Sequence, residues 1–89
     1  MNIAVFPGSF DPFTIGHQNI VERALPLFDR IIVAVGVNIN KKSLFPLEKR
    51  MEIIGNCFGD EKRVEVMTYE GLTVDFCRKM GARFIVRGI

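Results

Sequence analysis

Apolar residues along this chain follow two alternating patterns. Short runs that are apolar with little interruption predict strands, most of them covered on both faces of a sheet. Between these runs, apolar residues return every three or four positions, which is the spacing of one buried helix face. The predicted strands cover residues 2–6, 31–35, 64–68 and 83–86. The predicted helices cover about 15–28, 46–58 and 72–80.

This order predicts an α/β fold that runs β-α-β-α-β-α-β. Strands separated by helices pair in parallel through right-handed crossovers, so we expect a Rossmann-like, doubly wound parallel sheet. Pro26 should distort the last turn of the first helix, and Gly81 should close the third in the left-handed conformation. The inward faces of the three helices are predicted to carry Ile20, Val21, Ala24, Leu25, Phe28, Leu47, Met51, Ile54, Phe58, Leu72, Phe76 and Met80.

Composition restricts the class of protein. The 89 residues suffice for one domain, 1–89, and a net charge of +2 gives no reason to expect a nucleic-acid or membrane partner. The sequence has no basic leader and no apolar run of about 20 residues, so we expect a cytoplasmic protein. Cys57 and Cys77 form no CxxC pair, and the sequence has one histidine. We therefore expect two buried free thiols and no metal site.

Residues 8–17, GSFDPFTIGH, join the first predicted strand to the first predicted helix. The N–H groups at a helix start lack partners within the helix, and the helix dipole favours negative charge there, so this connection can hold a phosphate. His17 falls in the first helical turn, where a cation is unfavourable without an anion nearby. The alternative is an ordinary turn in which Gly8 and Gly16 relieve backbone strain and Pro12 stiffens the chain.

Further polar residues follow the other predicted strands. The 36–46 segment is long for a connection between strand and helix and carries Lys41 and Lys42, which fit either a phosphate site or a solvated basic turn. Arg87 follows the last strand, where its planar guanidinium could pair with a phosphate or lie on the surface. Asp11 is expected to fix its loop by accepting backbone N–H bonds rather than to bind metal. These residues are donors and cations, and they do not suggest an acyl-enzyme.

Three segments together resemble the nucleotidyltransferase superfamily, and within it the bacterial phosphopantetheine adenylyltransferases. The GSFDP run with Thr14, Gly16 and His17 resembles the T/HxGH motif at the start of the first helix. The segment KKSLFPLEKR resembles the family's KK-x-x-F-x-x-E-x-R pattern, and GLTVDF and the closing VRG resemble its later substrate-facing segments. The resemblance spans all 89 residues but about the first half of the family's usual chain, so we expect a domain truncated at its C-terminus.

The resemblance implies transfer of AMP from ATP to 4′-phosphopantetheine, giving dephospho-coenzyme A and pyrophosphate. It also implies Mg²⁺ accompanying ATP, and a homo-oligomer, commonly a hexamer, for the complete protein. A chain of this length should be weak or inactive alone, because the family's later nucleotide contacts lie beyond it.

The resemblance also implies roles for individual residues on the ATP side. His17 would donate to the α-phosphate, most strongly in the transition state, so it is the first catalytic candidate. Ser9 would bind phosphate through its hydroxyl, with the backbone N–H of Phe10 beside it. Gly88 would let the chain approach the nucleotide.

On the acceptor side, Ser9 is again implied as a contact. Lys41 would neutralise phosphate and is the second catalytic candidate, favoured over Lys42 by the alignment of the basic segment. Thr73 would contact the pantetheine arm, possibly by its backbone, and Arg87 would pair with the phosphate of phosphopantetheine.

Two other functions stay open at this point. One is a nucleotidyltransferase with a different acceptor, such as nicotinate mononucleotide or a glycerol phosphate. Thr14 argues against it, since those relatives usually carry a first histidine at that position. The other is a non-catalytic fragment that binds nucleotide or a partner protein.

Overall fold

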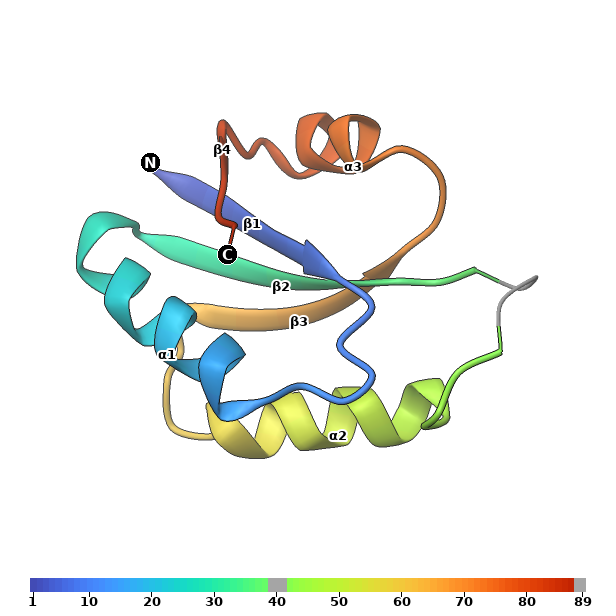
Figure 1. The fold of residues 1–89 in the computed structure, drawn as a ribbon. Helices are drawn as coiled ribbons and strands as arrows, with labels where there is room; N and C mark the ends of the chain where they lie inside the picture. Colours follow the sequence, from blue (N-terminus) through green and yellow to red (C-terminus); the bar gives the residue numbers. More distant parts are fainter. Residues whose placement is uncertain (39–41, 88–89) are drawn as a thin grey trace.

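The computed structural model describes residues 1–38 and 42–87 of the chain. These residues form a parallel sheet with helices between successive strands, as Figure 1 shows. The strands are β1 (Ile3–Gly8), β2 (Arg30–Gly36), β3 (Val64–Tyr69) and β4 (Phe84–Ile85). The helices are α1 (Ile15–Ala24), the 3₁₀ helix η1 (Leu25–Leu27), α2 (Leu47–Cys57) and α3 (Thr73–Met80).

The sheet has the strand order β3-β2-β1-β4, and every pair is parallel. β1 therefore lies in the interior, with Ile3 opposite Arg30 and Gly8 opposite Val35 on β2. The predicted Rossmann-like, doubly wound α/β fold is confirmed. In a parallel sheet the carboxyl ends of all strands meet at one edge, so the connections after β1, β2, β3 and β4 begin close together. Among the residues described, none of the helices is long and apolar enough to cross a membrane.

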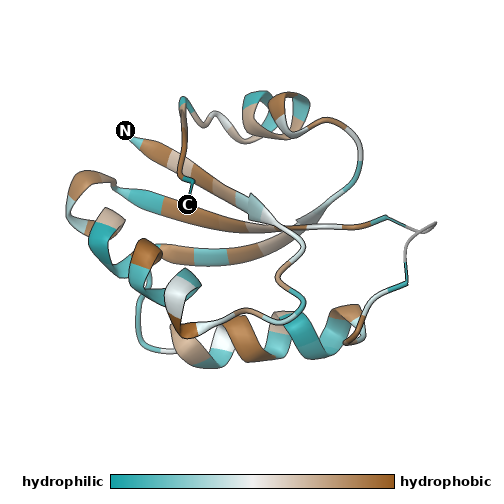
Figure 2. Ribbon diagram, viewed as in Figure 1, coloured by the Kyte–Doolittle hydropathy of each residue, from teal (hydrophilic) through white to brown (hydrophobic). Residues whose placement is uncertain are grey.

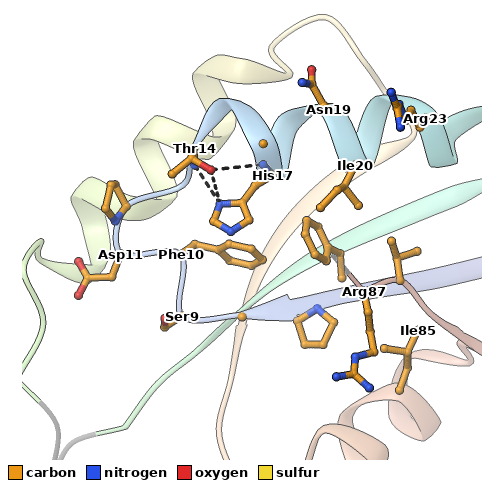
Figure 3. A pocket seen from close by; sticks show the side chains of 16 residues that line it. Ser9, Phe10, Asp11, Thr14, His17, Asn19, Ile20, Arg23, Ile85 and Arg87 are labelled. Carbon is orange, nitrogen blue, oxygen red and sulfur yellow. Dashed lines mark hydrogen bonds between the residues drawn. The ribbon is translucent and has the colours of Figure 1, made fainter. Parts of the chain in front are cut away.

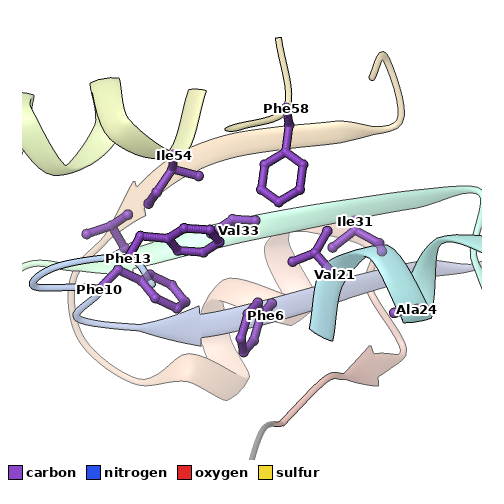
Figure 4. Packing of buried hydrophobic residues seen from close by; sticks show 10 residues of the cluster. Phe6, Phe10, Phe13, Val21, Ala24, Ile31, Val33, Ile54 and Phe58 are labelled. Carbon is purple, nitrogen blue, oxygen red and sulfur yellow. The ribbon is translucent and has the colours of Figure 1, made fainter. Parts of the chain in front are cut away.

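Successive residues of the strands pack against helices on opposite faces of the sheet. Val33 belongs to the larger core under α1 and α2, whereas Ile32 and Ala34 belong to the smaller core under α3. Figure 1 shows α1 and α2 on one face and α3 on the other, and Figure 2 shows the interior strands as largely hydrophobic. Figure 4 shows the larger core, in which Val21 and Ile54 from the two helices meet the aromatic rings of Phe6, Phe10, Phe13 and Phe58.

β1 continues two residues beyond its predicted end, through Pro7 and Gly8. A proline inside a strand removes a donor, yet here the loss has no consequence for the sheet. The backbone carbonyl of Val5 points toward β4, because it accepts from the N–H of Val86 at 2.9 Å. The backbone of Pro7, two residues later, is turned to the same side as that of Val5. The pairing with β4 has ended by then, so no strand there needs the N–H that proline lacks.

The helix ends follow local chemistry. The first helix stops at Ala24, and Pro26 falls in η1, which confirms the predicted distortion. Gly81 closes α3 with φ of 72°, also as predicted. Leu72 was predicted on the inward face of the third helix, and this is wrong: it is the N-cap of α3 and 70% exposed. The helix begins one residue later, so the burial falls on Phe76 and Cys77.

The two cysteines are both free. Cys77 is buried, and burial raises the pKa of its thiol. Cys57 is half-buried at the end of α2, so the prediction of a buried thiol holds for Cys77 alone.

Removing the side chain of Ile54 tests the larger core. Ile54 is fully buried on α2, so Ile54→Ala should lower the free energy of unfolding by about 2–5 kcal/mol, measured by urea denaturation. The control is Leu27→Ala, whose side chain is 69% exposed and which should change the value by less than about 0.5 kcal/mol. Equal effects of the two substitutions would contradict this description of the core.

Candidate active site

An open cleft of about 1190 Å³ lies at the carboxyl edge of the sheet. Its walls come from the end of β1, the connection that follows, the first turns of α1 and the segment after β4. Figure 3 shows His17 entering from α1 and Arg87 from the segment after β4. We call this cavity the first cleft.

His17 is fixed at the start of α1 by a capping box. Thr14 is the N-cap, and its Oγ1 accepts from the His17 backbone N–H at 3.4 Å. In return, the Thr14 backbone N–H donates to Nδ1 of the His17 ring at 2.9 Å, as Figure 3 shows. Glutamate or glutamine usually takes this position, and here an imidazole does the same work. The cap therefore orients the ring as well as starting the helix.

The same hydrogen bond determines the tautomer of His17. Nδ1 accepts a hydrogen bond, so it carries no proton, and the proton of the neutral ring is on Nε2. Partial burial lowers the pKa of His17 below its usual value, and a hydrogen bond accepted by the neutral form acts in the same direction. A neutral N–H donor thus stands at the positive end of a helix, where an imidazolium would be repelled.

Aromatic rings form the surroundings of His17. Its ring centroid lies 5.1 Å from that of Phe10, 5.3 Å from Phe13 and 6.1 Å from Phe6. Phe10 reaches this place through a left-handed backbone with φ of 47°. Its ring comes back over Gly8, where an added Cβ would lie 2.9 Å from the ring's Cζ. Only glycine fits under the ring, so Gly8 is a packing requirement as well as a flexible residue.

Asp11 ties the connection after β1 to the chain before α2. Its two carboxylate oxygens accept from the backbone N–H groups of Leu44 and Phe45, each at 2.7 Å. We predicted that Asp11 accepts hydrogen bonds from backbone N–H groups of its own loop. It does accept from backbone N–H groups, but these belong to the chain before α2. With both oxygens engaged, Asp11 is a poor metal ligand. No group of three or more His, Cys, Asp or Glu that could hold a metal ion occurs among the described residues.

A second cavity of about 520 Å³ lies on the other side of the connection after β1. Its lining includes Gly8, Ser9, Ser43, Arg50 and Tyr69, drawn from four different parts of the chain. Ser9 lines both cavities, whereas Phe10 lines the first and Arg50 the second. The connection after β1 is therefore the wall between them.

The sequence-predicted site residues divide into three groups. Ser9, Phe10, His17 and Arg87 all line the first cleft. Thr73, the first residue of α3, lines neither of the two cavities, and its hydroxyl is engaged with the hydroxyl of Tyr69 at 2.9 Å. Lys41 and Gly88 lie outside the described residues.

Sequence reasoning missed several residues that line the two cavities. Asn19 and Arg23 extend the first cleft along α1, on the face opposite the buried Val21. The signal was their helical spacing from Gly16, because Gly16, Asn19 and Arg23 stand at positions i, i+3 and i+7 and share one face of α1. Arg50 was part of a recognised segment, but no pattern indicated that its side chain is buried.

Comparison with known proteins bears on this site. A model of the cytidylyltransferase-like family matches residues 5–89. A phosphopantetheine adenylyltransferase of Flavobacterium psychrophilum is 56% identical over the whole chain, and one of Bacteroides thetaiotaomicron is 55% identical. The chain spans 59% of the length of each of these relatives.

Solved structures give a more distant likeness. A bifunctional NMN adenylyltransferase/ADP-ribose pyrophosphatase from Francisella tularensis matches with a TM-score of 0.68 and 26% identity, over 79% of this chain and 22% of that one. A NadR protein in complex with NAD and AMP-PNP matches with a TM-score of 0.68 and 28% identity, over 80% of this chain and 21% of that one.

The lowered pKa of His17 can be measured directly, because the sequence has one histidine. An NMR titration of the ring should give a pKa below the usual value of about 6.5. The unfolded chain then binds the proton first, so the free energy of unfolding should fall as the pH drops below about 6.5 toward the folded pKa.

The matched control is His17→Gln, which keeps a capping residue and removes the titrating group. In this variant the loss of stability between pH 6.5 and the folded pKa should disappear. A ring pKa at or above about 6.5 would contradict the assignment of a neutral Nε2–H donor.

Proposed function

We propose that this chain, which belongs to the cytidylyltransferase-like family, forms the nucleotide-binding part of an enzyme that moves AMP from ATP to 4′-phosphopantetheine. The products are dephospho-coenzyme A and pyrophosphate. The observation that carries the proposal is the neutral His17, held by the Thr14 cap with its Nε2–H free of that cap, in a cleft at the helix start. The names and 55–56% identity of the relatives support the choice of acceptor.

The proposed reaction needs no nucleophilic side chain. A phosphate oxygen of the acceptor attacks the α-phosphorus of ATP, the new P–O bond forms, and the bond to the pyrophosphate leaving group breaks. The protein's work is to bring two polyanions together and to stabilise charge on the α-phosphoryl oxygens. A fixed N–H donor suits this work, because it strengthens its hydrogen bond as that charge grows.

Four residues of the first cleft have distinct parts in the proposal. His17 donates from Nε2 to an α-phosphoryl oxygen, while the start of α1 adds the positive end of its dipole. Ser9 and Phe10 lie on the connection after β1, and they bind phosphate through the Ser9 hydroxyl and the Phe10 backbone N–H. Arg87, across the cleft, pairs with the acceptor phosphate, for which its two-pronged guanidinium is suited.

The second cavity is proposed to receive the pantetheine arm. Tyr69 and Gly71 line it, and Thr73 begins α3 two residues after Gly71. Because the Thr73 hydroxyl is already hydrogen-bonded to Tyr69, a contact from Thr73 to the arm would come from its backbone. Lys41 and Gly88 keep their proposed contacts with phosphate and nucleotide.

The remaining properties are proposed for the whole protein. Mg²⁺ would arrive bound to ATP and neutralise phosphate charge. The protein is proposed to act in the cytoplasm as a homo-oligomer, a hexamer in its complete form, without a nucleic-acid or membrane partner.

The test is pyrophosphate release with a panel of acceptors, on this chain and on a version extended to the length of its relatives. We expect release with 4′-phosphopantetheine and none with nicotinamide or nicotinate mononucleotide or glycerol phosphate. Calorimetry with ATP and with phosphopantetheine on both chains shows how much binding the 89 residues retain. If pyrophosphate is released with a pyridine mononucleotide and not with 4′-phosphopantetheine, the proposed acceptor is wrong. If the extended chain releases no pyrophosphate with any acceptor, the proposed enzymatic function is wrong.

His17→Ala tests the proposed role of the imidazole. In the extended chain it should lower kcat by about 10²–10³-fold and change the Kd for ATP far less, since the ring's bond strengthens in the transition state. His17→Gln is the matched variant, because its amide keeps the cap while offering no ring N–H. Parallel losses in kcat and ATP affinity would mean that His17 serves in binding alone.

A further inference from the structure

Arg50 is a buried cation with no acidic partner among the described residues. It lies on α2 with 6% of its surface exposed, and the ion pairs among the described residues involve other arginines and lysines. Its Nε is buried and has no hydrogen-bond partner within the described chain. A charge buried in this way is costly to the folded state, and its remaining hydrogen bonds show what it is used for.

Those hydrogen bonds join two segments that are far apart in the sequence. One terminal nitrogen of the guanidinium donates to the carbonyl of Ser9 at 2.8 Å, and the other to the hydroxyl of Ser43 at 3.4 Å. Asp11 makes a second tie between the same segments through Leu44 and Phe45. The connection after β1 is thus held against the chain before α2 at two points.

The bond to Ser9 determines how the next peptide is turned. A peptide unit is planar and trans, so its C=O and N–H point in opposite directions. Arg50 holds the Ser9 carbonyl on the side of the second cavity, and the N–H of Phe10 is therefore turned toward the side of the first cleft. The same peptide leads into the left-handed Phe10, whose ring packs against His17.

We propose that Arg50 is a positioning residue, which turns the Ser9–Phe10 peptide so that its N–H faces the first cleft and the Phe10 ring braces His17. Its effect passes through Ser9 and Phe10, and it touches no reacting atom. The ligand that this N–H would bind rests on the proposed function, whereas the orientation of the peptide does not.

The test begins with NMR on the chain without nucleotide. The wild-type chain should show a nuclear Overhauser effect between the Phe10 ring and the Gly8 Hα protons, because that ring lies over Gly8. Arg50→Met keeps the length of the side chain and removes its donors and charge, and it should lower this signal by at least half. Lys49→Met is the control, since it makes the same change of charge one position away on an exposed side chain and should leave the signal unchanged.

A second measurement follows activity in the extended chain. Arg50→Met should lower kcat for AMP transfer by about 10–100-fold while the KM for ATP changes less than about threefold. Arg50→Lys, which keeps the charge and places its N–H donors on a single nitrogen, should recover part of kcat. If the wild-type extended chain transfers no AMP, the proposed function fails, and the Overhauser signal still decides the role of Arg50.

The proposal is overturned if folded Arg50→Met keeps the Gly8–Phe10 signal at wild-type strength. It is also overturned if kcat of this variant stays within about twofold of an active wild type. Should Arg50→Met fail to fold, Arg50→Lys decides by the same signal. A lysine cannot hold Ser9 and Ser43 in one plane, so a reduced signal supports the proposal and an unchanged one overturns it.

Discussion

The site depends on the placement of β1 between β2 and β4. Ala4 and Val5 are fully buried, and Phe6 nearly so, because both faces of this strand are covered by helices. After β1 the chain leaves the sheet at the edge where the carboxyl ends of the strands meet. It must turn there within a few residues to begin α1, which packs on the same face of the sheet as α2. Three features of the first cleft follow from that turn: the glycine that ends the strand, the left-handed Phe10 and the capped start of the helix.

The charge on His17 follows from the same geometry. A histidine at the first turn of a helix has three reasons to stay neutral: the helix dipole, the aromatic rings around it and the N–H that Thr14 donates to Nδ1. A neutral ring costs the helix nothing, and it still leaves an N–H donor on Nε2. The positive charge of the cleft is supplied by two other residues, Arg23 on the outer face of α1 and Arg87 after β4.

The fold could be predicted from the sequence because its strands are apolar without alternation and its helices have one apolar face. The same signals identified residues 8–17 as a site, since they join a buried strand to a helix. Side-chain partners could not be predicted in this way. Nothing in the spacing indicates that Asp11 reaches Leu44 and Phe45, or that Thr73 is engaged by Tyr69, because these contacts join segments whose distance is determined by tertiary packing. The prediction that Leu72 is buried was wrong for a local reason. The helix begins one residue later than predicted, so Leu72 is its N-cap and does not belong to the buried helix face.

The features that sequence rules did not foresee are also the ones that cost stability. A left-handed phenylalanine and a buried arginine with no acidic partner among the described residues are both unfavourable for a small domain. Phe10 lies on the connection after β1 and Arg50 bonds to that connection from α2, whereas the two cores are built from ordinary apolar packing. If such destabilising residues were placed at random, they would be spread over the chain. Their concentration beside one cleft indicates that this connection is held in shape for binding, and that the cores provide the stability that it lacks.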